Sequence, residues 1–257
     1  MRELSQAEAF ARIRLLRSPN IGPVSYAQLL ARFGTAEAAL EALPDLAKGG
    51  KRTYRAAPKD KIEREIAATR AAGGRYLFHD QPGYPALLGE IDGAPPILTY
   101  RGDLRLAAQP CVAMVGARNC SAAAVKLARE FATALAEAGF AVVSGLARGI
   151  DGAAHEGAFP GTIGIIASGL DIAYPPQHAE LQERIAVEAL LLAEQAPGTE
   201  PRGSHFPSRN RIIAGLALGT LGFHVAAPLG VAQRDVVARG KEAVAAALVH
   251  QRVVVEA

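Results

Sequence analysis

Four polar segments after residue 115 are rich in glycine, hydroxyl and arginine residues. They span residues 116–121, 144–151, 167–171 and 202–211, and three of them carry arginine. A glycine turn lets the backbone approach a bound group closely, and a guanidinium offers a rigid fork of donors to a phosphate. The free N–H groups at the start of a following helix add positive partial charge. These residue types predict an anion-binding site, with phosphate as the commonest ligand.

The segment 202–211 favours a polymeric ligand. It carries Arg202, Arg209 and Arg211 together with Phe206, and it has no acidic residue. Basic groups follow a sugar–phosphate backbone, and an aromatic ring offers a stacking face to a base. A single Phe in an apolar chain is also typical of a core, and that alternative stays open for Phe206. We expect a basic loop here and a helix that begins at Ile212.

Asp151 and His155 stand four residues apart, a spacing that places two side chains on one face of a helix. Such a pair could serve acid–base chemistry or bind a metal. Alternatively, Asp151 caps the helix N-terminus and His155 packs against the preceding loop. We favour this second interpretation because no third ligand or nucleophile stands at a predictable distance. The sequence thus predicts no catalytic residue and no metal ligand.

The common nucleotide-binding motifs are absent from the sequence. The turn at 116–121 is not G-x-G-x-x-G, and the next apolar segment ends in Ser144, where a dinucleotide site has Asp or Glu. The chain has no G-x-x-x-x-G-K-[ST] loop and no G-x-S-x-G elbow. We therefore expect no NAD, FAD or nucleoside triphosphate, and no other cofactor.

Apolar strands alternating with helices position these polar segments. Strands are expected at 111–115, 140–143, 162–166 and 189–193, and helices at 122–138, from Asp151 and at 178–186. Continuous apolar strands that alternate with helices indicate a parallel sheet covered on both faces. The predicted fold is α/β, a Rossmann-like doubly wound and mostly parallel sheet. Ligands of such a sheet bind at the carboxyl ends of its strands.

The N-terminal third is helical in pattern and basic in charge. Short amphipathic helices are expected over 6–47, and a further helix over 59–72 that ends at Gly73 and Gly74. The segment 20–30 resembles a helix-hairpin-helix turn, although a plain packing joint is an equal alternative. Residues 1–75 carry 14 Lys and Arg against 8 Asp and Glu, whereas 76–257 carry 14 against 17. This asymmetry indicates either solvated helix faces or attraction to a polyanion.

Composition places the protein in the cytoplasm. The two cysteines, Cys111 and Cys120, fit neither a metal site nor a disulfide framework. No apolar run reaches the roughly 18 residues of a membrane span, and the first residues lack the apolar core of a secretion signal. We expect a reduced, soluble protein without a membrane partner.

Four motifs follow one another between residues 116 and 216. They read G-A-R-N-C-S (116–121), S-G-L-A-R-G-I-D-G-A-A-H (144–155), S-G-L-D-I-A-Y-P-P (168–176) and F-P-S-R-N-R-I-I-A-G-L (206–216). Each motif alone identifies a protein family with modest specificity, but the four motifs in this order are highly specific. With a lead-in around 84–103 they cover about 76–220. Through this set the chain resembles the DNA-processing protein A (DprA/Smf) family.

The resemblance implies a single-stranded-DNA-binding mediator rather than an enzyme. Members protect incoming DNA and load the RecA recombinase during natural transformation, and they pair as homodimers. Many carry a small sterile-alpha-motif-like helical domain, which corresponds to 1–75, before an extended Rossmann-like domain, which corresponds to 76–257. The family's DNA pocket falls here on Arg118, Ser144, Gly145, Arg148, Phe206, Arg209, Asn210 and Arg211. The neighbouring loop positions complete the expected DNA-binding set: Gly116, Ala117, Asn119, Ser121, Gly149, Ser168 and Gly169.

The chain departs from the family pattern at several places. Residues 123–124 are Ala-Ala where Tyr-Gly is common, and the stretch 158–162 is short. After Thr220 the family's apolar strand, Ser-Gly-Ser turn and helix are not recognisable, and no C-terminal winged helix is clear. Either the chain has internal deletions or loops are missing from the numbered sequence. We favour missing loops, because losing an inner strand would expose the core.

The main alternative is a nucleotide-binding enzyme or sensor of the related phosphoribohydrolase group. Those enzymes bind a nucleoside monophosphate at an equivalent edge of the sheet. Their P-G-G-x-G-T turn with a following catalytic Glu is absent, and residues 167–171 stand in its place. The sequence therefore favours the DNA-binding mediator.

Overall fold

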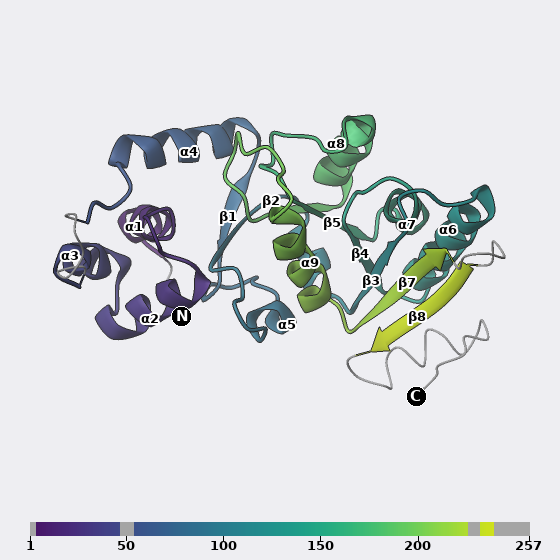
Figure 1. Ribbon diagram of the computed structural model, residues 1–257, viewed down its shortest axis with the longest axis horizontal. Helices are drawn as coiled ribbons and strands as arrows, with labels where there is room; N and C mark the ends of the chain where they lie inside the picture. Colours follow the sequence, from purple (N-terminus) through teal and green to yellow (C-terminus); the bar gives the residue numbers. More distant parts are fainter. Residues whose placement is uncertain (1–3, 47–53, 226–231, 239–257) are drawn as a thin grey trace.

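Two regions of different architecture make up the structure, a group of helices and a large sheet with helices on both faces (Figure 1). The computed structural model describes residues 4–46, 54–225 and 232–238. The expected fold class is confirmed, with a helical N-terminal region followed by an α/β region.

In residues 4–46 and 54–74 the N-terminal region contains helices α1 (Gln6–Leu16), α2 (Pro23–Phe33), α3 (Ala36–Leu46) and α4 (Lys59–Ala71). Ser5 caps α1 by accepting a hydrogen bond from the Glu8 N–H group. Pro23 occupies the first turn of α2, where a missing N–H group costs nothing. Helix α4 ends as expected, because Gly73 adopts a φ of +72° that favours glycine.

A shared apolar cluster joins these helices to the sheet. Ile13 of α1 and Ile62 of α4 pack with Phe78 and Ile97, which belong to strands β1 (Arg75–Phe78) and β2 (Ile97–Gly102). An ion pair between Arg12 and Asp80, 2.5 Å between Nη1 and Oδ1, lies beside this cluster. The helical region is therefore held against the edge of the sheet through apolar packing and a partly buried charge pair.

Within the described part of the chain, the sheet has eight strands in the order β1-β2-β6-β5-β4-β3-β7-β8. Five central strands run parallel: β3 (Cys111–Gly116), β4 (Ala141–Ser144), β5 (Thr162–Ile166), β6 (Leu190–Ala193) and β7 (Gly219–Val225). The outer strands β1, β2 and β8 (Ala232–Ala238) pair antiparallel. The chain winds from β3 outward to β6 and then returns to the other side of β3 as β7. This reversal is the place where α/β sheets bind ligands.

Helices cover both faces of the parallel strands. Helices α6 (Ala122–Glu137), α7 (Ile150–Ala158) and α8 (Ala179–Glu188) pack on one face. Helices α9 (His205–Leu216) and α5 (Ala86–Gly89) pack on the other, and α9 crosses in front of the sheet in Figure 1. Apolar side chains from alternate strand positions supply both cores, which explains why the strand sequences are apolar throughout.

Two features differ from the sequence prediction. Helix α9 begins at His205 and not at Ile212, so the expected basic loop is its first two turns. Pro207 is compatible with this start, because proline is tolerated in the first turn of a helix. A strand, β7, also follows Gly219, where the sequence showed no clear strand. Gly219 and Gly222 interrupt its apolar pattern.

Candidate nucleic-acid interface

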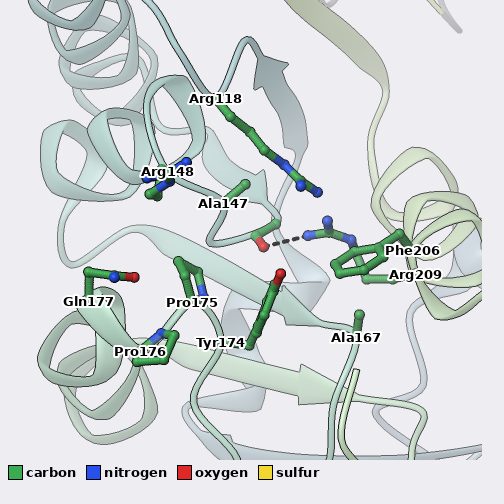
Figure 2. Close-up of a pocket in the computed structure, with 11 residues that line it drawn as sticks. Arg118, Ala147, Arg148, Ala167, Tyr174, Pro175, Pro176, Gln177, Phe206 and Arg209 are labelled. Atoms are coloured by element: carbon green, nitrogen blue, oxygen red, sulfur yellow. Dashed lines mark hydrogen bonds between the residues drawn. The ribbon is translucent and has the colours of Figure 1, made fainter. Parts of the chain in front are cut away.

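A cavity of about 250 Å³ opens at the carboxyl ends of β3, β4 and β5. Its walls come from the loops after these three strands, from the start of α9 and from the segment before α8 (Figure 2). It is lined by Arg118, Gly145, Ala147, Arg148, Ala167, Tyr174, Pro175, Pro176, Gln177, Phe206 and Arg209. Three of these side chains are guanidinium groups and none is acidic, so the lining favours an anion.

Two aromatic rings and one guanidinium form the mouth of this cavity. The ring centroids of Tyr174 and Phe206 lie 5.8 Å apart at an interplanar angle of 51°. The Arg118 guanidinium lies over the Phe206 ring, with Cζ 5.3 Å from the centroid. Figure 2 shows Arg118 extending toward Phe206 while Tyr174 stands on the opposite wall. Both Arg118 and Tyr174 are exposed. A positive charge and two stacking faces therefore meet at one opening.

Arg209 lies deeper and is 7% exposed. Its Nη1 donates to the carbonyl oxygens of Gly145, at 2.5 Å, and of Ile165, at 3.1 Å. Burial lowers the pKa of this guanidinium, while the nearby Asp151 carboxylate counters that effect. A buried charge is stable only when it is hydrogen bonded. Arg209 therefore connects the ends of β4 and β5 first of all, and its expected contact with DNA remains a proposal.

Gly145 makes this approach possible. A Cβ atom at position 145 would lie 1.5 Å from Nη1 of Arg209. Any side chain here would displace the guanidinium from the two carbonyl oxygens. The glycine of the second motif and an arginine of the fourth therefore depend on each other.

A second cavity of about 340 Å³ lies beside the first and shares lining residues with it. Gly116, Asn210 and Thr220 line it, together with Arg118, Ala147 and Arg209, which line both cavities. Asp151 also lines it, and its carboxylate accepts a hydrogen bond from the Ala147 N–H group at 3.4 Å. Burial raises the pKa of Asp151. The expectation that Asp151 caps this helix is wrong, because Gly149 is the N-cap residue of α7 and Asp151 lies in its first turn, where it stabilises the loop after β4.

His155 packs against the same loop, as the sequence suggested. Its Nε2 accepts a hydrogen bond from the Leu146 N–H group at 3.3 Å, and its Nδ1 lies 2.7 Å from Oγ1 of Thr162. Complete burial lowers the pKa of His155 to about 3, and the charges of His178 and Arg209 add to this. His155 is therefore a neutral structural residue.

The structure brings five of the expected residues together at the first cavity: Arg118, Gly145, Arg148, Phe206 and Arg209. Gly116 and Asn210 line the neighbouring cavity. Asn119 is exposed in the same loop as Arg118, and Ala117 donates its N–H to Phe223 in β7. Gly149 packs against that loop, since a Cβ there would meet the Ala117 oxygen at 2.4 Å.

The other expected residues are engaged elsewhere. Ser121 caps α6, and the buried hydroxyl groups of Ser144 and Ser168 donate to the carbonyl oxygens of Met114 and Ile172. The N–H group of Gly169 donates to the Thr199 oxygen. Arg211 forms an ion pair with Glu194. Arg211 does not line either cavity, so its expected phosphate contact has no support from the geometry.

Tyr174 and the residues that follow it were missed by the sequence analysis. Tyr174, Pro175, Pro176 and Gln177 form the wall opposite Arg118. The third motif contains the Tyr-Pro-Pro triplet, and an aromatic residue next to two prolines in a polar segment was the available signal. The periodicity of apolar residues, which predicts helices and strands, does not indicate a function for Tyr174.

Within the described residues, no group of three or more His, Cys, Asp and Glu side chains is arranged to hold a metal ion. Over the same residues, no helix is both long and apolar enough to cross a membrane.

We predict that Gly145→Ala destabilises the protein by about 2–4 kcal/mol, because its Cβ displaces Arg209 from its carbonyl acceptors. Unfolding in urea measures the change. Gly203→Ala is the matched control, since a Cβ there meets nothing within 4 Å. Arg209→Met should remove most of the cost of Gly145→Ala in a double-mutant cycle. Additive effects of the two substitutions would contradict the assigned contact.

We also predict an acid-sensitive stability that depends on His155. The pKa of this side chain is about 3 when folded and about 6.5 when unfolded, so the unfolded chain binds more protons between these values. The stabilisation is complete above pH 6.5 and is lost as the pH falls toward 3, by about 1.4 kcal/mol per pH unit. The difference between wild-type and His155→Gln unfolding free energies should shrink over this window. A pH-independent difference would rule out a buried neutral imidazole.

Comparison with known proteins places the chain in one family. A family model described as DNA recombination-mediator protein A matches residues 75–230. A second model, described as a DprA-like N-terminal HHH domain, matches residues 6–68.

Curated relatives and solved structures agree with these matches. The chain is 45% identical over 141 residues to DNA processing protein DprA of Streptococcus pneumoniae, which is 54% of this chain and 50% of that protein. It is 42% identical over 154 residues to protein Smf of Synechocystis sp., which is 57% of this chain and 39% of that protein. The chain therefore spans half or less of the length of these two relatives.

Two solved structures are similar in fold and in sequence. The X-ray structure of DNA processing protein A from Streptococcus pneumoniae matches with a TM-score of 0.66 and 31% identity, over 86% of this chain and 78% of that one. DNA processing protein A from Helicobacter pylori, studied for its single-stranded DNA binding mode, matches with a TM-score of 0.55 and 29% identity, over 62% and 74% of the two chains. The protein whose structure we describe belongs to the DNA recombination-mediator protein A (DprA/Smf) family of DNA-processing proteins.

Proposed function

We propose that this protein binds single-stranded DNA along the carboxyl edge of its sheet and acts as a recombination mediator without catalysis of its own. The observation that carries the proposal is the meeting of Arg118, Arg148, Tyr174 and Phe206 at one cavity. The solved relative from Helicobacter pylori is described by its single-stranded DNA binding mode, which supports the same ligand here.

The positive charge of the cavity suits a phosphate backbone. Arg118 and Arg148 are exposed at its rim, and Arg209 adds a buried positive charge beneath them. Contacts to phosphates carry no sequence information, so binding should depend little on base sequence and strongly on salt.

The two aromatic rings suit the bases of an unpaired strand. Tyr174 and Phe206 lie at the mouth of the cavity, where bases of a bound strand can stack on them. A duplex keeps its bases stacked inside and offers them to neither ring. The rings therefore favour single-stranded over double-stranded DNA.

The wider role follows the family. We propose that the protein protects incoming single-stranded DNA and loads the RecA recombinase onto it during natural transformation. We also propose that it works as a homodimer in the cytoplasm. The helical residues 1–75 and the Rossmann-like residues 76–257 would form two domains, with the basic helical domain adding long-range attraction to the DNA.

The salt dependence of DNA binding tests the phosphate contacts. We expect Arg118→Ala and Arg148→Ala each to weaken oligo-dT binding roughly tenfold. Together they should reduce the slope of log K against log salt by about 1.4, or about 0.7 per lost phosphate contact. Arg105→Ala is the matched control, because it removes an exposed charge near the amino ends of the strands. Filter binding from low to high salt provides the measurement.

Unchanged affinity and slope in the double variant would disprove this binding site. Release of free base from AMP by the wild-type protein would instead favour the phosphoribohydrolase-like alternative.

An abasic oligomer separates stacking from phosphate binding. We predict that Phe206→Leu and Tyr174→Leu each lower the affinity for oligo-dT by about 1–3 kcal/mol. Neither should alter the affinity for an abasic strand of equal length, because it keeps the phosphates and lacks the bases. Fluorescence anisotropy with labelled strands measures both affinities. Equal losses on the two strands would show that the rings support the fold of the pocket and do not stack on bases.

A further inference from the structure

Leu146 adopts a backbone conformation that is unusual for its residue type. It lies between Gly145 and Ala147 in the loop after β4, with a φ of +55°. This left-handed conformation is unfavourable for a non-glycine residue, because Cβ lies too close to a neighbouring carbonyl oxygen. Its side chain is fully buried in the core under α8. The loop that carries Arg148 to the cavity therefore depends on a strained peptide that other groups must stabilise.

His155 accepts a hydrogen bond from the backbone of Leu146. The Leu146 N–H group donates to Nε2, so the proton of the neutral imidazole is on Nδ1. Nδ1–H then donates to Oγ1 of Thr162, which in turn donates to the Val142 oxygen at 3.0 Å. This chain of hydrogen bonds anchors the loop to strands β4 and β5.

His178 binds the same residue from the cavity wall that contains Tyr174. Its Nδ1 donates to the Leu146 carbonyl oxygen at 2.9 Å. His178 follows directly after Pro175, Pro176 and Gln177, which line the cavity across from Arg118. Thus one residue of the loop after β4 is bound through both its N–H and its C=O, and the second of these bonds connects two walls of the cavity.

We propose that His155 and His178 are positioning residues for DNA binding, which together fix the loop carrying Arg148 at a set distance from the wall carrying Tyr174. This inference rests on the proposed function, since it concerns the same cavity. Neither histidine lines the cavity, so both act through Leu146 and do not contact the DNA.

Two variants of His178 test the connection between the walls. His178→Leu removes the donor, whereas His178→Asn keeps an N–H group near the place of Nδ1. We expect oligo-dT affinity to fall roughly 3- to 10-fold in His178→Leu and to recover in His178→Asn. Gly152→Ala should reproduce the loss, because its Cβ would lie 2.8 Å from Cε1 of His178. Urea unfolding of each variant separates lost binding from lost fold.

Nitrogen NMR of the histidine rings tests the hydrogen bonds of His155 to Leu146 and Thr162. At pH 7 we expect His155 to be neutral, with its proton on Nδ1. A proton on Nε2, wild-type affinity in both His178→Leu and Gly152→Ala, or failure of His178→Asn to recover binding would each overturn the positioning role. Failure of the wild-type protein to bind oligo-dT would instead remove the proposed function itself, which keeps the two results distinct.

Discussion

The buried guanidinium of Arg209 determines the form of the cavity. It leaves α9 on one face of the sheet and reaches the carbonyl oxygens of Gly145 and Ile165, where two neighbouring strands end. A buried charge in this position is stable because these hydrogen bonds to carbonyl oxygens replace its contacts with water. The absence of a side chain at Gly145 is the condition for the approach. Arg209 thereby fixes the loop after β4 relative to the end of β5, and the cavity lies between the loops that follow these strands.

This arrangement divides the arginines into two groups. Arg209 is buried and donates hydrogen bonds to backbone carbonyl oxygens, and Arg211 forms an ion pair with Glu194. Arg118 and Arg148 are exposed at the rim, beside Tyr174 and Phe206. Fewer arginines are therefore available to a ligand than the motifs suggest. The cavity also offers two aromatic rings, whereas the sequence predicted one. A site with two exposed charges and two rings matches a flexible single strand, which can adjust its phosphates and its bases independently.

The sequence predicted the sheet well and the side-chain contacts poorly. The expected strand at 189–193 is a continuous apolar run between turns, a pattern that depends on local residues alone. Strand β7 was missed because Gly219 and Gly222 interrupt its apolar pattern, and the start of α9 was misplaced because its first residues are mostly polar and basic and were interpreted as a loop. The role of Arg209 was beyond sequence reasoning, since its acceptors are backbone atoms 64 and 44 residues away. Tyr174 was missed for a similar reason, because only the fold places it opposite Phe206.

Photo-crosslinking with a thymidine-analogue oligomer tests the central claim most directly. A strand carrying a photoreactive base should crosslink to peptides that contain Tyr174 or Phe206, and high salt should abolish the crosslinks along with binding. Their appearance at the carboxyl ends of β3 to β5 would identify the cavity as the DNA site. Crosslinks confined to the amino ends of the strands, around residues 104–108, or to helices α1 to α4 would contradict the account.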